Sequence, residues 1–518
     1  MQRPTTAKAV ATAAALLVLL AGCGGKDDDK GNGTSKDGGD NPASTPSAPA
    51  VASFDPPKGF NPIQAYGVLK SDTEDTYSLS AGMVGQTSLV SGKTGLTGRD
   101  IAGQRDPWTV LSTTKPDTIS TVAHTDPMPV QVDGKDVIAI AYVQNDKGGG
   151  TQKVHGQVLL QWLDAADGKK LAELTVDLSQ TLGPGGGSKG FLSKSYDQAT
   201  GQVALGLSID AADGEKKAGS AITIFADPKT QKANVIPFFE AAGVLNGTVV
   251  GTKASNSEGA HDGTIVIADG ASGKVSKQIP TKLNYLQPAG SGTKHAFLSG
   301  SSYVPNSKSV IYTYINTLYS VDIATGAVVQ TKSALDTEHD YYFRCLGDQA
   351  AGVVCTTGEN PGTDEIIGID DTTGKKVWGY TKSSASRIVP RVTAAFHGVV
   401  YGVAGEDQPV MLNLAGGQDI PRPSSDPSSS DPSGTPTTGT TPTDGTTPTD
   451  DGLVTPPTET PGVNDPSSAF GSSMSFYDPK LGVPSPTAVT QYGGAYLQEA
   501  LGDDLEREKI LVVLKPTA

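Results

Sequence analysis

One short pattern recurs along most of this chain: an apolar run, then Asp, small residues, Thr or Ser with Gly, and Lys before the next run. The clearest copies span Asp164 to Gly168, Asp269 to Gly273, Asp322 to Gly326 and Asp370 to Gly374. An Asp carboxylate accepts hydrogen bonds from backbone N–H groups two or more residues on, and Gly takes the positive φ that closes a tight turn. The pattern therefore predicts hairpins between antiparallel strands.

The spacing of the copies indicates how the hairpins are grouped. Weaker copies occur at Asp227 to Lys232, at Leu414 to Gly417 and, in degenerate form, at Val90 to Gly95. From Asp227 to Asp370 the aspartates lie about 42 to 53 residues apart, the length of one four-stranded propeller blade. Since a single hairpin cannot bury its own apolar face, we expect an all-β propeller of four-stranded blades, with seven favoured and eight possible.

The repeat resembles that of the PQQ-like (pyrroloquinoline-quinone-type) β-propellers, whose blades carry Asp-x-x-Thr-Gly-Lys-x-x-Trp. The segment from Asp370 to Trp378 matches in full, and the resemblance covers roughly residues 65–515. In the other copies the place of the Trp is taken by Ala172, Val235, Lys277 and Gln330.

Quinoprotein dehydrogenases that share this repeat use a pair of adjacent cysteines and a calcium site beside the quinone. No two cysteines of this chain are adjacent, and the Asp-rich turns lack the alternating acidic ligands and terminal Glu of an EF-hand. No nucleophile elbow of the Gly-x-Ser-x-Gly type occurs either. We therefore expect no cofactor, no metal and no catalytic residues.

The N-terminus resembles a bacterial lipoprotein signal peptide. Arg3 and Lys8 form a short positive region, and the uncharged apolar stretch 9–20 leads into the sequence Leu20-Ala21-Gly22-Cys23. About twelve residues of helix span only roughly 18 Å, too short for the ~30 Å hydrocarbon core of a membrane. We expect cleavage between Gly22 and Cys23 and lipidation of Cys23, which would anchor the protein to the extracytoplasmic face of the cell membrane.

Two polar segments divide the rest of the chain. Residues 23–57, rich in Gly, Asp, Ser, Lys and Pro, are expected to be a disordered tether after the signal peptide 1–22. Residues 58–420 carry the propeller repeats, and the Pro-, Ser- and Thr-rich segment 421–467 is expected to be a disordered insertion. Strand-like runs resume within residues 468–518, and these strands are predicted either to close the ring against the N-terminal blade or to form an eighth blade.

Two further cysteines flank a strand-turn-strand pattern. Cys345 and Cys355 are separated by ten positions, which fits no common redox or zinc motif. Outside the cytoplasm such thiols become oxidised, so a structural disulfide is favoured over a metal or redox pair.

The charge of the chain limits its partners. The net charge of −15 disfavours nucleic acid, because phosphate binding needs clustered Lys and Arg. The leading hypothesis is a non-enzymatic binding or scaffold module that holds a protein or glycan partner at the cell surface. The alternative is a small-ligand receptor or quinone-dependent oxidoreductase with its site in the propeller channel. The Ala-, Gly-, Thr- and Asp-rich composition suggests a high-GC Gram-positive source.

Overall fold

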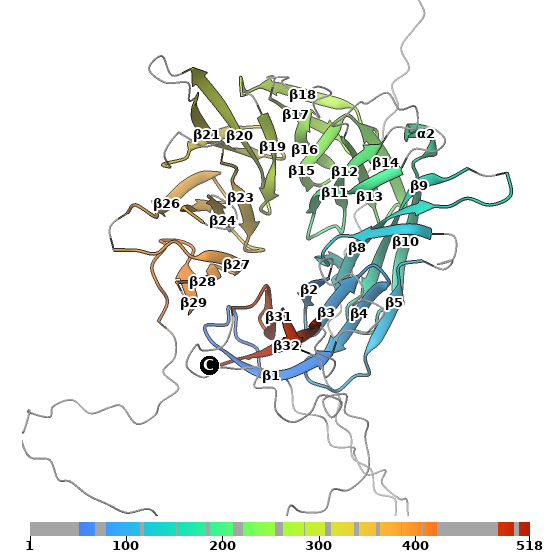
Figure 1. Cartoon of the computed structure of the whole chain (residues 1–518), viewed down its shortest axis with the longest axis horizontal. Helices are drawn as coiled ribbons and strands as arrows, with labels where there is room; N and C mark the ends of the chain where they lie inside the picture. Colours follow the sequence, from blue (N-terminus) through green and yellow to red (C-terminus); the bar gives the residue numbers. More distant parts are fainter. Residues whose placement is uncertain are drawn as a thin grey trace, which may run out of the picture. The chain divides into compact units, whose positions relative to one another are not determined.

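Eight antiparallel sheets follow one another along the chain and form the blades of a β-propeller (Figure 1). The computed structural model describes residues 51–67, 79–113, 119–151, 153–182, 187–210, 221–253, 263–283, 285–305, 312–335, 341–358, 363–384, 386–405, 408–421, 485–501 and 507–517. Within this part of the chain the only α-helix is α2 (Ser179–Leu182). No helix among these residues is both long and apolar enough to cross a membrane.

The first four blades account for the N-terminal half of the ring. Blade 1 contains β2 (Ser80–Val84), β3 (Thr87–Gly92), β4 (Gly95–Asp100) and β5 (Trp108–Leu111). Blade 2 contains β6 (Ile119–His124), β7 (Met128–Val132), β8 (Lys135–Asp146), β9 (His155–Asp164) and β10 (Lys170–Asp177). Blade 3 contains β11 (Gly187–Tyr196), β12 (Val203–Asp210), β13 (Ala221–Asp227) and β14 (Lys232–Pro237). Blade 4 contains β15 (Phe239–Leu245), β16 (Thr248–Lys253), β17 (Thr264–Asp269) and β18 (Val275–Pro280).

The remaining four blades complete the ring. Blade 5 contains β19 (Tyr285–Ser291), β20 (His295–Pro305), β21 (Tyr312–Asp322) and β22 (Val328–Lys332). Blade 6 contains β23 (Arg344–Gly347), β24 (Gly352–Thr357), β25 (Glu365–Asp370) and β26 (Lys375–Thr381). In the described residues blade 7 has three strands: β27 (Arg391–Phe396), β28 (Val399–Ala404) and β29 (Gln408–Asn413). Blade 8 contains β30 (Ala488–Thr490), β31 (Gly493–Leu501), β32 (Arg507–Pro516) and, from the other end of the chain, β1 (Phe60–Gly67).

The first strand of each blade is the innermost. Figure 1 shows β11, β15, β19, β23 and β27 around the centre of the ring, and each of them contacts the next. The circle closes where β30 contacts both β27 and β2. In blade 8, β1 pairs with β32 from Phe60 opposite Pro516 to Gly67 opposite Ile510, which joins the two ends of the described chain (Figure 1).

The ring therefore has eight blades, the alternative count, and not the favoured seven. The C-terminal strands form a blade of their own with β1, while β2 to β5 make a separate complete sheet. Closure by strands from both ends gives blade 8 four paired strands, and the outermost strand of each blade keeps only a short edge.

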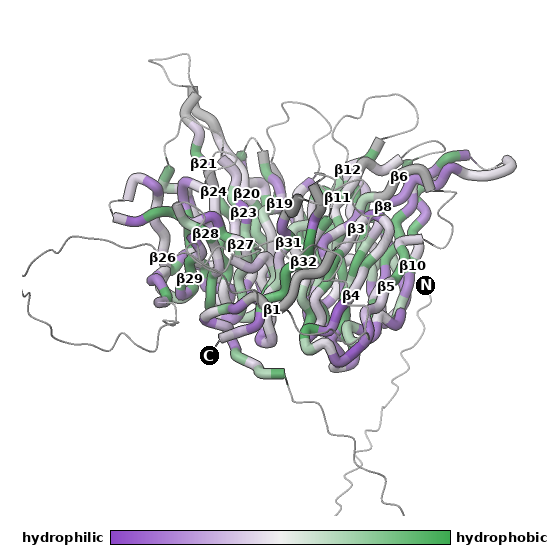
Figure 2. Tube along the Cα trace, turned by 60° about the horizontal axis from the view of Figure 1, so that its bottom comes forward, coloured by the Kyte–Doolittle hydropathy of each residue, from purple (hydrophilic) through white to green (hydrophobic). Residues whose placement is uncertain are grey.

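The core lies between the blades rather than inside any one of them. Clusters of buried residues combine strands of adjacent blades, such as Val250 and Ile267 of blade 4 with Leu298 and Val321 of blade 5. Figure 2 shows apolar stretches along the strands and hydrophilic stretches at turns. Because strand side chains alternate between two sheet faces, and both faces of a blade meet a neighbour, the central strands bury apolar residues together with Ser and Thr side chains on both faces. Each fully buried aliphatic side chain stabilises the fold by roughly 1.5–3 kcal/mol.

The repeated turns join the third and fourth strands of the blades. Their Gly residues have φ of 71° (Gly168), 68° (Gly273), 67° (Gly326) and 69° (Gly374), the left-handed region that a Cβ atom disfavours. The Asp side chains accept hydrogen bonds from backbone N–H groups within the same turn: Asp164 from Ala166, Asp269 from Ser272, Asp322 from Thr325 and Asp370 from Thr372.

The degenerate copy at Val90 to Gly95 is not such a turn. It connects β3 to β4, the second and third strands of blade 1. The turn between the third and fourth strands of this blade follows Asp100. Asp100 lies opposite Thr87 of the second strand, as the turn aspartates of other blades lie opposite the first residue of their second strands. Asp100 accepts hydrogen bonds from Gln104 and Arg105. The predicted hairpin is confirmed, but it joins the second and third strands of the blade, and the Asp that sets the blade register lies further on.

Fourth strands dock onto the turn of the following blade. Trp378 donates its indole N–H to the carbonyl of Leu414 at 2.5 Å, and a Cβ atom on Gly417 would lie 2.6 Å from the indole ring. Trp108 occupies the same place in blade 1, where a Cβ on Gly168 would lie 2.4 Å from its ring. Trp108 stands at the repeat position counted from Asp100, and the misplaced copy at Val90 to Gly95 concealed it.

Polar side chains take over this docking in other blades. Lys277 donates to the carbonyl of Gly326 at 2.9 Å, and Asn234, the neighbour of Val235, donates to the carbonyl of Gly270 at 3.0 Å. The contact between blades therefore survives the loss of the Trp in the sequence.

Candidate functional site

Five of the innermost strands carry a polar residue at a shared level. In five blades the turn Asp, or Asn413 in blade 7, lies opposite the first residue of the second strand. The fifth residue of that second strand is therefore an equivalent position in each of these blades. The first-strand residues opposite that point, called here the polar level, are Ser80 (opposite Ser91), Glu240 (Thr252), Gln287 (Ser299), Arg344 (Thr356) and Arg391 (Val403).

The next residue along each of these strands has an apolar side chain. These residues are Ala81, Ala241, Pro288, Cys345 and Val392. Ala241, Cys345 and Val392 belong to hydrophobic clusters between blades. The polar level is therefore a local feature of the innermost strands, and the strands as a whole are not polar.

In blades 1 to 3, hydrogen bonds and an ion pair within the protein satisfy the polar side chains near the centre of the ring. The innermost position of blade 2 is interrupted between β6 and β7, and Asp126 lies at the interruption. Its carboxylate accepts a hydrogen bond of 2.5 Å from the Ser80 hydroxyl and forms an ion pair with Lys194 of β11. Desolvation raises the pKa of Asp126, but the Lys194 charge and the two hydrogen bonds lower it by more, so this pKa lies below its usual value.

Glu240 on β15 lies between blades 3 and 4. The Thr223 hydroxyl donates to the carbonyl of Phe239 at 2.8 Å and accepts the N–H of Ala241 at 3.0 Å, which holds the backbone on both sides of Glu240. A Cβ atom on Gly206 would lie 3.2 Å from Glu240 Cγ, so this glycine makes room for the side chain. Burial raises the pKa of the Glu240 carboxyl to about 7, and no described residue donates a hydrogen bond to it.

On the opposite side of the ring the polar level faces solvent. Gln287, Arg344 and Arg391 are all exposed although they belong to innermost strands. Leu346, two residues after Arg344 on the same strand face, is 43% exposed. Arg344 and Leu346 of β23 and Gln287 of β19 thus present a positive charge, an apolar side chain and an amide to solvent.

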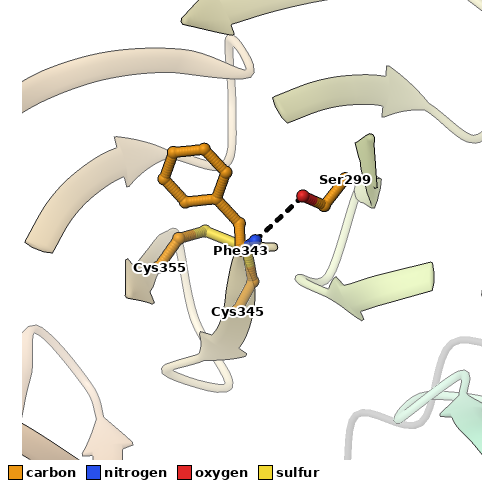
Figure 3. Close-up of a disulfide and its surroundings, with 4 residues drawn as sticks. All are labelled: Ser299, Phe343, Cys345 and Cys355. Atoms are coloured by element: carbon orange, nitrogen blue, oxygen red, sulfur yellow. Dashed lines mark hydrogen bonds between the residues drawn. A yellow bond between two sulfur atoms is a disulfide. The ribbon is translucent and has the colours of Figure 1, made fainter. Parts of the chain in front are cut away.

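The predicted disulfide is confirmed, and it underlies this part of the site. Cys345 of β23 lies directly opposite Cys355 of β24, and their sulfur atoms are 2.06 Å apart (Figure 3). Both cysteines pack with Phe343 against Phe297 and Leu318 of blade 5, and the Phe343 N–H donates to the Ser299 hydroxyl at 2.8 Å (Figure 3). The alternation along β23 then turns Arg344 and Leu346 to the other face.

Apart from the two cysteines of the disulfide, the residues singled out in the sequence fall into two places. Gly22 and Cys23 lie outside the described residues, as do the signal peptide and most of the predicted tether and insertion. The turn residues lie at the ends of strands and are not brought together with the polar level. Within the part of the chain that the structure describes, no group of three or more His, Cys, Asp or Glu residues is arranged to hold a metal ion.

The polar level itself was missed in the sequence. Its residues share no motif, and their distance from the turn Asp differs between blades because the connections between second and third strands differ in length. Only the strand register aligns them.

No protein-family model matches the chain, and no curated protein matches it. Among solved structures it is similar to the β-propeller domain of the Trilobed protease from Pyrococcus furiosus, with 12% identity over 58% of this chain and 85% of that chain and a TM-score of 0.34. It is also similar to the dihydro-heme d1 dehydrogenase NirN, with 12% identity, coverage of 74% and 76% and a TM-score of 0.37. A third similar structure is the Dos1 propeller, with 12% identity over 65% of this chain and 78% of that chain and a TM-score of 0.38.

Proposed function

We propose that this protein is a membrane-anchored β-propeller lipoprotein that serves as a non-enzymatic binding or scaffold module on the extracytoplasmic face of the cell membrane. The anchor would be the lipidated Cys23 after removal of residues 1–22. The propeller would hold a protein or glycan partner at the surface. This proposal combines the signal-like N-terminal sequence with the way in which the described chain enters the ring.

The observation that carries the proposal is the attachment of the N-terminal segment to blades 7 and 8. The Phe54 N–H donates to the carbonyl of Gln491 at 2.8 Å, and the Tyr401 hydroxyl donates to the carbonyl of Pro57 at 2.7 Å. Asp55 pairs with His397 at 2.7 Å. Residues 54–57, at the end of the predicted tether, thus contact the ring at three points.

These contacts give an anchor a mechanical connection to the whole propeller. The attached segment continues directly into β1, the strand that completes blade 8. A pull on the N-terminus would thus be borne by the contacts of residues 54–57 and by the β1–β32 ladder together. Such an arrangement suits a domain that is held at a membrane while its ring binds a partner.

The anchor is tested by replacing Cys23 with Ala in the full chain expressed in its own host. We expect the variant to be released into the medium, whereas a Gly25→Ala control stays in the membrane fraction. Retention of Cys23→Ala in that fraction would contradict the anchor.

The binding role needs a separate experiment. Crosslinking on intact cells, followed by purification of the anchored chain and identification of the attached molecule, should yield a specific protein or glycan. Saturable binding of pyrroloquinoline quinone with calcium, together with dye-linked substrate oxidation, would instead favour an enzyme.

A further inference from the structure

At four junctions between blades, a side chain of the fourth strand contacts the turn of the following blade. Trp108 of blade 1 and Trp378 of blade 6 each pack on a glycine of that turn. Asn234 of blade 3 and Lys277 of blade 4 donate hydrogen bonds to its carbonyl groups. Because fourth strands are the outermost ones, these contacts hold the outer parts of neighbouring blades together.

The outer edge of blade 7 is built differently. In the described residues its sheet ends with β29, and the chain beyond it makes one isolated bridge, from Leu412 to Asp419. The Met411 carbonyl points to this edge, where it accepts the Ile420 N–H at 2.8 Å. Two positions earlier on the same edge stands Pro409, whose nitrogen carries no hydrogen. A further strand here would therefore lack one hydrogen bond of its ladder.

The segment that precedes β1 contacts both blades at the junction of blades 7 and 8. Residues 54–60 are called here the clamp. Toward blade 8, the Phe54 N–H donates to the carbonyl of Gln491, in the turn between β30 and β31. Toward blade 7, the Tyr401 hydroxyl of β28 donates to the carbonyl of Pro57. The clamp thus bridges the two blades at the junction that follows the incomplete sheet.

The contacts of the clamp with blade 7 differ in burial. Tyr401 is 1% exposed, and its ring lies 5.7 Å from that of Phe60, the first residue of β1. Because water cannot replace a lost partner in a buried site, the hydrogen bond from Tyr401 should contribute most of the attachment. The ion pair between Asp55 and His397 is partly exposed, and such pairs contribute little.

Blades 7 and 8 also meet directly near the centre of the ring. The innermost strands β27 and β30 are in contact, and Val489 of β30 packs with Phe396 of β27. The hydroxyl groups of Thr393 on β27 and Ser485, which precedes β30, lie 2.8 Å apart. The direct contacts and the clamp therefore hold this junction together.

We propose that the clamp keeps the ring closed between blades 7 and 8, and that its release opens the ring at this junction rather than at another. The N-terminal part of the chain enters the ring through the clamp, so a cut or a pull on that part acts first on this junction. This proposal rests on contacts within the ring and does not depend on the lipid anchor or on the partner.

Hydrogen exchange of the purified full chain, measured on peptic peptides by mass spectrometry, tests the proposal because it detects rare openings that leave the folded state dominant. Tyr401→Phe removes the buried bond to Pro57 and keeps the ring contact with Phe60. We expect at least about fivefold faster exchange in β27 and β30, and a further increase when Asp55→Ala is added. Exchange in blades 3 and 4 should stay within about twofold of the unchanged protein.

Tyr319→Phe is the matched control at another junction. Tyr319 of blade 5 is 4% exposed, and its hydroxyl forms a hydrogen bond with Thr281, which follows the last strand of blade 4. The Lys277 contact still holds that junction in the variant. Exchange in β18 and β19 should therefore change by less than about twofold. A junction of blades 4 and 5 that opened as readily would contradict the special role of the clamp.

A crosslink distinguishes opening of the junction from a general loss of stability. Thr393→Cys and Ser485→Cys place two thiols where the two hydroxyl groups now meet, and a disulfide between them ties blade 7 to blade 8. Added to Tyr401→Phe, this disulfide should return exchange in β27 and β30 to within about twofold of the unchanged protein. Equal acceleration in all blades, acceleration that persists with the crosslink, or unchanged exchange in Tyr401→Phe/Asp55→Ala would each overturn the proposal.

Discussion

The carboxylate of Asp371 in blade 6 accepts the backbone N–H of His295 in blade 5 at 3.1 Å, and His295 Nδ1 donates back to the Asp371 carbonyl at 2.7 Å. Asp371 also accepts the N–H groups of Thr293 and Lys294, and its side chain is almost fully buried. One carboxylate thus holds the first turn of a neighbouring blade.

Removing that carboxylate should destabilise the ring. Asp371→Ala leaves several buried donors without their acceptor, and we expect the free energy of unfolding to fall by roughly 2–4 kcal/mol. Asp370→Ala, which removes only an exposed acceptor of the same turn, should cost about 1 kcal/mol. Denaturant unfolding followed by circular dichroism measures both, and equal losses would contradict the role given to Asp371.

The Trp378 side chain should contribute more to the free energy of unfolding than that of the adjacent Val377. Trp378→Ala removes an indole that packs on Gly417 and bonds to Leu414, so we expect a loss of roughly 2–3 kcal/mol in the free energy of unfolding. Val377→Ala, at a side chain that is 50% exposed, should change it by less than about 0.5 kcal/mol. A Trp378→Ala variant as stable as the unchanged protein would show that the docking is dispensable.

The raised pKa of Glu240 should make the protein less stable as the pH rises through 7. Its folded pKa of about 7 exceeds the ordinary value of 4.5, so the folded state retains a proton that the unfolded chain has lost between these values. Its favourable contribution is complete below pH 4.5 and is lost as the pH rises through 7. Glu240→Gln should therefore raise the melting temperature at pH 8.5 relative to the unchanged protein and leave it nearly unchanged at pH 4.

Glu173 is the control for this measurement. Desolvation raises the pKa of Glu173, but hydrogen bonds from Lys170 and Gln161 lower it by more, so its net shift has the opposite direction. Glu173→Gln should lower the melting temperature at pH 8.5. If the two variants responded alike, the environment assigned to Glu240 would be wrong.

The disulfide should contribute to the stability of blade 6. It closes a short loop, for which loop entropy corresponds to about 2–3 kcal/mol. The Cys345→Ser/Cys355→Ser double variant should lose about this much free energy of unfolding. Mass spectrometry of the purified protein should find neither Cys345 nor Cys355 as a free thiol, and two free thiols would remove this prediction.

A single substitution can remove one hydrogen bond that attaches the N-terminal segment to the ring. Tyr401→Phe deletes only the hydroxyl that donates to the Pro57 carbonyl and keeps the ring contact with Phe60. We expect faster proteolytic cleavage near residues 51–58 in the variant, with an unchanged pattern in the blades. A matched Tyr380→Phe control should cleave as the unchanged protein does, and equal rates in all three would contradict the contact.

The sequence alone determined the local structure of this protein. The Asp-to-Gly pattern predicts turns because the Asp acceptors and the positive-φ glycines act within five residues, and the apolar runs between the turns predict strands buried on both faces. The cysteines were placed correctly because a hairpin brings residues ten positions apart face to face.

Only the tertiary structure decided the blade count and the candidate site. Phe60 lies opposite Pro516, a pairing that no local pattern encodes, so the ring gained an eighth blade. The polar level likewise depends on strand register across connections of unequal length, which leaves Arg344 and Arg391 aligned in space without a shared motif in the chain. Turn chemistry is local, whereas ring closure and side-chain convergence are properties of contacts between blades.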